Sequence, residues 1–76
     1  MPETARLFSE RLNQCLDDTG APAPMRERAA VLSKMIDIPK QVAWSLLEGH
    51  QLPDQTILQK IAIEFEVDPK WLSGEK

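Results

Sequence analysis

The sequence predicts an all-α domain of five short helices, and three observations support this fold class. Apolar residues recur at spacings of three and four, the period of an amphipathic helix. Prolines and glycines interrupt this period and divide the chain into five segments. No stretch shows the apolar-polar alternation of a strand. The length of 76 residues leaves room for one domain, residues 1–76.

The first two helices are predicted over about residues 4–17 and 25–36. Their apolar stripes are formed by Phe8, Leu12 and Leu16 in the first and by Met25, Ala29, Leu32 and Ile36 in the second. Cys15, beside the first stripe, is expected to be a small buried apolar side chain. The segment 17–24 should be a loop, because its two prolines lack backbone donors and restrict the residues before them.

The third helix is predicted over about residues 39–48. Pro39 separates it from the second helix, since proline disfavours helical geometry at the residue before it and suits the first turn of a new helix. Gly49 supplies the left-handed conformation that is common just beyond a helix end. The narrow inward side of this helix is formed by Ala43, Leu46 and Leu47.

The fourth and fifth helices are each predicted to begin after an aspartate N-cap, Asp54 and Asp68. Pro69 suits the first turn of the short fifth helix, which would place Trp71 and Leu72 against the core. The buried stripe of the fourth helix is formed by Ile57, Leu58, Ile61, Ala62 and Phe65.

Composition excludes several kinds of site. Cys15 is the only cysteine and His50 the only histidine, so we expect no disulfide, no metal and no cofactor. No apolar run approaches the roughly 20 residues of a membrane span, and the N-terminus lacks the layout of a signal peptide. We therefore expect a cytoplasmic protein. The sequence has no nucleophile with a plausible base and no glycine-rich phosphate loop, so an enzyme is not expected.

Charge is distributed unevenly along the chain. The formal net charge of −3 argues against a nucleic-acid partner at first sight, because binding to phosphate depends on Lys and Arg. Residues 25–50, however, contain four basic and three acidic residues, whereas both flanking segments are acidic. Any DNA-facing surface is therefore expected in the middle of the chain.

The predicted helices 25–36 and 39–48 are joined by too few residues to pack antiparallel, so they must cross steeply, as in a helix-turn-helix motif. The residues around them make this interpretation more specific. They are Arg28-Ala29-Ala30 and Leu32, then Leu52-Pro53-Asp54 after Gly49, then Leu58, Ile61-Ala62, Phe65, Val67-Asp68-Pro69, Trp71-Leu72 and Gly74-Glu75. From Phe8 to Glu75 the chain resembles the phage-repressor and Cro-like (XRE) family of helix-turn-helix regulators.

The resemblance implies a compact five-helix repressor-like helix-turn-helix domain, with the motif at about residues 25–48. It implies a sequence-specific transcriptional regulator, encoded by a bacterium or phage, associated with the nucleoid and expected to repress. Such a protein binds double-stranded DNA at a palindromic operator as a homodimer. Because nothing follows the predicted fifth helix, the dimer is expected to use the fourth and fifth helices and the tail. No small-molecule ligand is expected.

The resemblance places the base-reading residues early in the third helix, at Lys40, Gln41, Trp44 and Ser45. Gln41 can pair with adenine, Lys40 can donate to guanine or phosphate, and Ser45 can serve in either role. Trp44 leaves three roles open: contact with a thymine methyl group, cover for a neighbouring helix, or contact with a dimer or other protein partner.

The phosphate candidates lie on either side of these residues. The resemblance implies that the first turn of the second helix approaches phosphate, which nominates Arg26 and Arg28, helped by the helix dipole. Surface ion pairing is their alternative role. They are expected on the polar side of that helix. His50 and Gln51, just past the third helix, are further candidates for contact with the DNA backbone.

Three features depart from the family pattern. Pro39 stands where a Ser or Thr cap is usual, so one side-chain contact to phosphate is missing. Asp37 and Glu66 stand at turn positions that are usually glycine, where left-handed geometry costs about 1 kcal/mol. Few basic residues remain, so DNA binding should be modest, salt-sensitive and dependent on dimerisation.

The main alternative is an acidic protein-interaction module, or an antitoxin-like regulator that binds both DNA and a protein partner. Lys40, Gln41 and Ser45 favour DNA, whereas Val42 and Trp44 favour a protein surface. The exposed side of the third helix therefore distinguishes the two functions.

Overall fold

The computed structural model describes residues 3–74, which form five helices and no strand. The helices are α1 (Glu3–Thr19), α2 (Met25–Ile36), α3 (Lys40–Glu48), α4 (Gln55–Phe65) and α5 (Pro69–Ser73). The expected all-α class with five helices is confirmed. Compared with the predicted boundaries, α1 extends to Thr19, and α3 begins at Lys40 because Pro39 is its N-cap. Glu75, part of the sequence pattern, lies outside the described residues.

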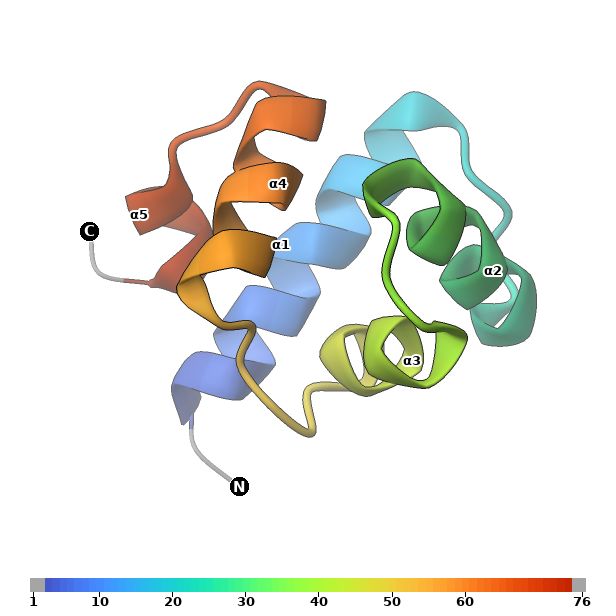
Figure 1. Cartoon of the computed structure of the whole chain (residues 1–76), viewed down its shortest axis with the longest axis horizontal. Coiled ribbons are helices and arrows are strands. Elements are labelled where there is room, and N and C mark those ends of the chain that lie inside the picture. The colour runs from blue at the N-terminus through green and yellow to red at the C-terminus, as the bar shows by residue number, and fades with distance from the viewer. Residues whose placement is uncertain (1–2, 75–76) are drawn as a thin grey trace.

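The helix α1 runs through the middle of the molecule, with α2 and α3 on one side and α4 and α5 on the other (Figure 1). It packs against α3 and α5, while α4 packs against α5 and α2. The apolar stripes meet in one core, whose fully buried large side chains are Phe8, Leu12, Leu16, Leu32, Leu46, Ile61 and Leu72. The helix α3 is therefore held from its inner side by α1 and α2.

Two side chains near the core were singled out in the sequence. Cys15 is buried, as expected, and this burial together with the negative charge of Asp18 raises the pKa of its thiol. The thiol therefore stays protonated and unreactive near neutral pH. Trp71 packs against the core but is only partly buried. The Cζ atom of Arg11 lies 5.0 Å from the centre of its ring, and the Arg11 guanidinium donates a hydrogen bond to its carbonyl oxygen. These contacts fasten α5 to α1.

The helix starts differ in how their backbone N–H groups are satisfied. The Oδ1 atom of Asp54 accepts a hydrogen bond from the Ile57 N–H at 2.8 Å, and that of Asp68 accepts one from the Lys70 N–H at 2.9 Å. Both predicted N-caps are confirmed. The residues before α2 and α3 are Pro24 and Pro39, and neither supplies a side-chain cap.

The residues that end α2, α3, α4 and α5 adopt left-handed backbone geometry. Asp37 ends α2 at φ 58°, Glu66 ends α4 at φ 56°, and the glycines Gly49 and Gly74 end α3 and α5 at φ 79° and 81°. Gly49 was expected to end its helix in this way. The first two carry a Cβ in a region where L-residues are strained by about 1 kcal/mol. No helix within the described residues has the length and apolar character needed to cross a membrane.

Candidate nucleic-acid interface

The outer face of α3 presents the sequence-predicted base-reading residues. Ala43, Leu46 and Leu47 are buried on the inner side, as expected from the sequence. Lys40, Gln41 and Trp44 are exposed on the outer side and line one shallow hollow with an apolar floor. Trp44 follows Gln41 and Lys40 by three and four residues, about one helical turn, so it can engage one ligand together with either of them.

The other residues near this face differ in exposure. Ser45 is partly buried, and its carbonyl oxygen accepts a hydrogen bond from the His50 N–H. Val42 is also partly buried and packs against the core, so it contributes little to an exposed protein-binding surface. Trp44 is 39% exposed, so part of its side chain is open to a partner. We name the outer face of α3, defined by Lys40, Gln41, Trp44 and Ser45, the α3 face.

The connection between α2 and α3 is only three residues long and is well fixed. The left-handed residue Asp37 turns the chain, and the Ile38 N–H donates to the Ser33 carbonyl oxygen at 3.0 Å. The Ile38 side chain packs against the core, and Pro39 follows in extended geometry. Because the turn is closed by backbone bonds and apolar contacts, α3 has a defined orientation on α2.

The first turns of α2 and α3 expose positive ends of helix dipoles. Since their N-cap residues are prolines without a side-chain acceptor, the first N–H groups of both helices have no side-chain cap. Arg26 is exposed in the first turn of α2, as expected of a phosphate candidate. Glu27, also exposed in that turn, reduces the net positive charge there.

Arg28 is not a phosphate candidate, which corrects the expectation from the sequence. Only 4% of this residue is exposed, and its guanidinium makes as many hydrogen bonds as it has N–H donors. The closest joins Nη2 to Oδ1 of Asp17 at 2.6 Å. Because every donor is used within the protein, none remains for DNA.

The partners of Arg28 show what it does instead. Its Nε donates to the Pro22 carbonyl oxygen at 2.8 Å, and its Nη1 donates to both the carbonyl and the Oδ1 of Asn13. The partners therefore belong to α1 and to the loop that precedes α2. Arg28 fixes this loop and with it the position of the first turn of α2.

Arg6 is a cation near α3 that sequence reasoning did not single out. A Cβ atom added at Gly49, the residue that ends α3, would lie 3.5 Å from Arg6 Cα and 3.2 Å from Ser9 Oγ. The start of α1 therefore packs closely on the end of α3. The Nε of Arg6 lies 3.6 Å from an oxygen of Glu10, and both side chains are largely exposed. Such a surface pair contributes little and leaves Arg6 available to a phosphate.

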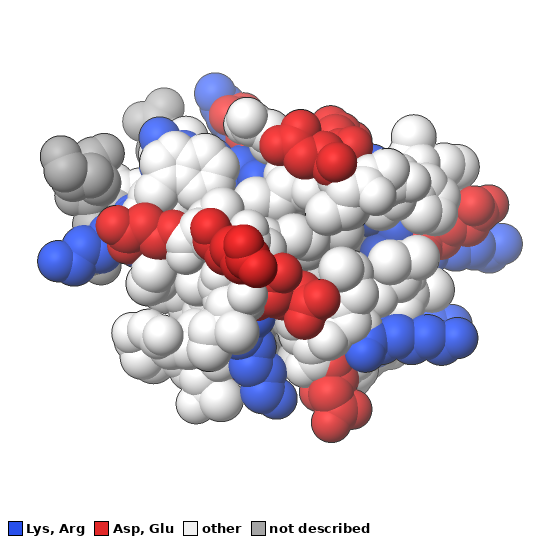
Figure 2. Space-filling model, turned by 90° about the horizontal axis from the view of Figure 1, so that it is seen from above, with Lys and Arg blue, Asp and Glu red and all other residues white. Residues whose placement is uncertain are grey.

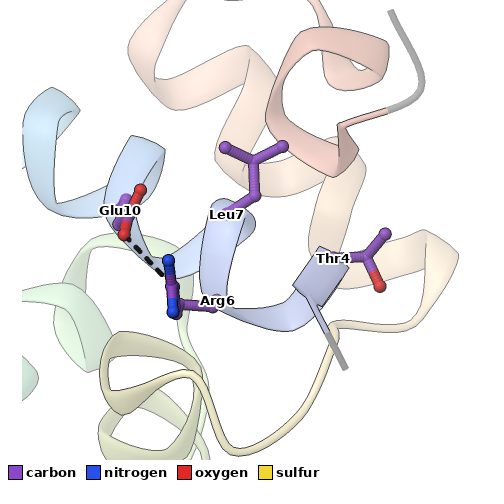
Figure 3. A pocket seen from close by; sticks show the side chains of 4 residues that line it. All are labelled: Thr4, Arg6, Leu7 and Glu10. Atoms are coloured by element: carbon purple, nitrogen blue, oxygen red, sulfur yellow. Dashed lines mark ion pairs between the residues drawn. The ribbon is translucent and has the colours of Figure 1, made fainter. Parts of the chain in front are cut away.

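Figure 3 shows Arg6 on the rim of a hollow on α1. The hollow is lined by Thr4, Arg6, Leu7 and Glu10, and the ion pair crosses one side of it (Figure 3). All four residues belong to one helix. Among the residues that the structure describes, no buried polar side chain lacks a hydrogen-bond partner, so none is available to a ligand in this hollow.

His50 and Gln51 follow α3 and are exposed, as expected for backbone candidates. The Nε2 of His50 lies 3.8 Å from an oxygen of Glu48, which is itself on the exposed side of α3. Like the pair of Arg6 and Glu10, this surface pair contributes little and leaves His50 available to a phosphate.

One group of acidic residues lies away from α3. Asp18, Glu64 and Glu66 line one hollow between the end of α1 and the end of α4. Figure 2, which looks down on these helix ends, shows a band of acidic side chains across that face. The helix α3 lies at the opposite side of the molecule (Figure 1). These three charges therefore do not oppose an anion at α3, whereas the exposed Asp37 and Glu48, just before and at the end of α3, do.

Comparisons with protein-family models, with curated proteins and with solved structures found no match to this chain. Within residues 3–74, no three His, Cys, Asp or Glu side chains lie close enough together to hold a metal ion. The α3 face and the cations around it are thus the features from which a function can be argued.

Proposed function

We propose that this protein is a sequence-specific DNA-binding regulator of the repressor type, in which α2 and α3 form a helix-turn-helix motif. The observation that supports this most strongly is the exposed α3 face on a helix held rigidly to α2, opposite the acidic face. An α-helix with its side chains is about 10–12 Å in diameter, so α3 fits a major groove about 12 Å wide.

The α3 face supplies groups that can distinguish base pairs. The amide of Gln41 offers adenine a donor and an acceptor, and Lys40 donates to guanine or to a phosphate. Ser45, being partly buried, makes at most one contact. The indole of Trp44, at the edge of an apolar hollow, packs on a thymine methyl group.

Contacts to the DNA backbone come from both ends of the motif. Arg26 and the uncapped N–H groups of α2 approach one phosphate. Arg6 approaches another beside the end of α3, with His50 and Gln51 as neighbours. These contacts fix the orientation of α3, while its own side chains read the bases.

The low number of cations sets the affinity. With Lys40, Arg26 and Arg6 from each of two subunits, the slope of log affinity against log salt should be about −5. Binding by one subunit should be weak, so useful affinity requires a homodimer on a palindromic operator, where it blocks transcription.

A salt titration with random duplex DNA tests the proposal. Fluorescence anisotropy should show binding at about 50 mM salt that is lost as the salt rises. No binding at high micromolar protein in low salt would contradict the proposal.

Site selection followed by Gln41→Ala tests the assignment of the α3 face. The variant should lose its preference at one base step, at about 1–3 kcal/mol, and keep its affinity for random DNA. Gln59→Ala, which removes an exposed glutamine of α4, is the matched control and should leave the preference unchanged. An unchanged preference in Gln41→Ala would remove this residue from the reading set.

A protein-binding function is the second candidate, because Trp44 is exposed beside an apolar hollow and the protein carries a net charge of −3. The two functions differ in how they depend on Trp44 and Gln41. If Trp44→Ala abolishes binding to a protein partner while neither side chain affects DNA, the protein-interaction module is the correct function. If Trp44→Ala and Gln41→Ala both weaken DNA binding, the protein-interaction module is not the correct function.

A further inference from the structure

The side chain of Asn13, on α1, forms hydrogen bonds to α2 and α3 as well as within its own helix. Its Nδ2 donates to the carbonyl oxygens of Ser9 at 2.8 Å and Leu47 at 3.1 Å. Its Oδ1 accepts a hydrogen bond from Nη1 of Arg28, also at 3.1 Å. Leu47 belongs to the last turn of α3 and Arg28 to the first turn of α2. One partly buried amide thus joins three helices.

The bond to Leu47 satisfies a carbonyl group at the end of α3. The N–H groups of Gly49 and His50, which follow the helix, donate to carbonyl oxygens earlier in α3. Within residues 3–74, no backbone N–H donates to the Leu47 oxygen. Only 2% of Leu47 is exposed, so without Asn13 this polar group would lie in a largely buried residue with no partner.

The bond to Arg28 connects the end of α3 to the start of α2. The same Nη1 of Arg28 also donates to the backbone carbonyl of Asn13 at 3.2 Å, and the guanidinium is held further by Asp17 and Pro22. Because an amide is planar and hydrogen bonds are directional, Leu47 cannot move relative to Arg28 without weakening one of the two bonds.

The two ends of α3 are held in different ways. Its start follows the short turn that is closed by backbone bonds. Its end is held by the apolar contacts of Leu46 and Leu47, which have no preferred direction, and by the bond from Asn13, which has one. Without this bond the end of α3 can shift about its start, and the α3 face turns with it.

We propose that Asn13 is a positioning residue for DNA reading, whose amide fixes the end of α3 relative to the start of α2. The inference deepens the proposed function and rests on it for the effect on DNA. Arg26 approaches a phosphate, whereas Gln41 must align with a base edge. Phosphate contacts carry no direct sequence information, and base contacts depend on alignment. Loss of the Asn13 amide therefore weakens discrimination between sequences more than binding to random DNA.

Amide hydrogen exchange without DNA tests the connection itself. Asn13→Asp keeps an acceptor for Arg28 but has no N–H for the carbonyl groups. Exchange of the His50 N–H, which donates to the last turn of α3, should become about tenfold faster relative to that of the Leu58 N–H at the start of α4. Asn13→Leu removes the acceptor as well, so exchange of the Arg28 N–H at the start of α2 should also become faster.

The next residue, Gln14, supplies matched controls because it is an exposed amide on the same helix. Gln14→Glu repeats the change from amide to carboxylate, and Gln14→Leu repeats the change to an apolar side chain. Neither variant should change the relative exchange of the His50 or Arg28 N–H groups. Circular dichroism verifies that each variant is folded.

Fluorescence anisotropy with the selected operator and with random duplex measures the effect on DNA. Asn13→Leu should lower the ratio of the two affinities about tenfold, with the affinity for random DNA within about twofold of the wild type. A merely structural defect would lower both affinities by the same factor, because it lowers only the fraction of folded protein. Gln14→Leu should leave the ratio unchanged.

The outcomes separate this inference from the proposed function. Exchange at His50 that only follows exchange at Leu58, or equal losses of affinity for both DNAs, would overturn the role of Asn13 while the function stands. If exchange responds as expected but the wild type binds no DNA, the function is wrong and the role of Asn13 in reading falls with it, although the connection between α2 and α3 stands.

Discussion

The helices on one side of α1 begin at aspartates, and those on the other side begin at prolines. Asp54 and Asp68 close the starts of α4 and α5 with hydrogen bonds from their carboxylates. Pro24 and Pro39 leave the starts of α2 and α3 without any such cap. The helices α4 and α5 are thus stabilised by caps in their own sequence. The helices α2 and α3 instead keep N–H groups without a side-chain cap, at positions where a ligand anion could take the place of the cap.

The starts of α2 and α3, which have no side-chain cap, are stabilised by contacts with other parts of the chain. The start of α2, which no cap stabilises, is fixed instead by Arg28, whose guanidinium binds α1 and the preceding loop. The start of α3 is fixed by the short turn and by the core contacts of Ile38. The starts of α2 and α3 are therefore stabilised by tertiary contacts rather than by caps, which leaves their first N–H groups free to bind an anion.

The largest effect is expected when the Arg28 contacts are removed. Arg28→Met should lower the free energy of unfolding by about 3 kcal/mol, because buried carbonyl groups lose charged donors. Urea denaturation followed by circular dichroism measures this. Arg26→Met, two residues away but exposed, should change stability by less than about 0.5 kcal/mol and should weaken DNA binding. Equal losses of stability in both variants would contradict the role assigned to Arg28.

The next effect is expected when a side-chain cap is added at the start of α3. Pro39→Asp should leave stability nearly unchanged, since the new cap offsets the lost rigidity of proline. It should lower DNA affinity about tenfold, because the carboxylate occupies the α3 N–H groups and repels phosphate. Pro39→Asn adds a cap without charge and should lower affinity less. If Pro39→Asp binds DNA like the wild type, the open start of α3 does not face phosphate.

Removal of the cap of α4 should have the opposite result: lower stability with unchanged DNA affinity. Asp54→Ala should lower the free energy of unfolding by about 1 kcal/mol through loss of the bond from Ile57, with DNA affinity per folded molecule unchanged. Thermal denaturation and anisotropy measure the two quantities. Asp54→Asn, which can still accept the bond, should retain most of the stability. A loss of DNA affinity in Asp54→Ala would show that DNA binding by α2 and α3 depends on the cap of α4.

The smallest effect is expected at the helix ends. Glu66→Gly should raise the stability by about 0.5 to 1 kcal/mol, because glycine adopts the left-handed geometry of this position without strain. Asp37→Gly should raise it less, since aspartate tolerates this geometry better than glutamate. The midpoint of thermal unfolding measures both gains. A lower midpoint in Glu66→Gly would mean that the side chain makes a contact that outweighs the strain.

The elements that could be predicted from the sequence are those whose cause is local. The N-caps Asp54 and Asp68 bond to N–H groups two or three residues ahead, and Gly49 ends its helix through its own backbone. The helix spans follow from apolar periodicity for the same reason. The exposure of Lys40 and Gln41 also followed from that periodicity, because the inward side of α3 was identified correctly.

The residues that were misassigned or missed depend on distant parts of the chain. Arg28 was expected on the polar side, yet it lies four residues before Leu32 and three after Met25, at the edge of the buried stripe. That spacing was a usable signal, but its partners in α1 were not predictable. Arg6 approaches α3 only because α1 crosses its end.

The contact between Arg11 and Trp71 has a consequence for the kinetics of folding. It joins residues 60 positions apart, whereas the side-chain contacts of Arg28 span 15 positions or fewer. Contacts of long sequence separation carry the largest loop-closure cost and form after local ones. The docking of α5 on α1 is thus expected to follow the main barrier of folding. Its loss is then an early step of unfolding, so this contact sets how long the molecule stays folded more than how fast it folds.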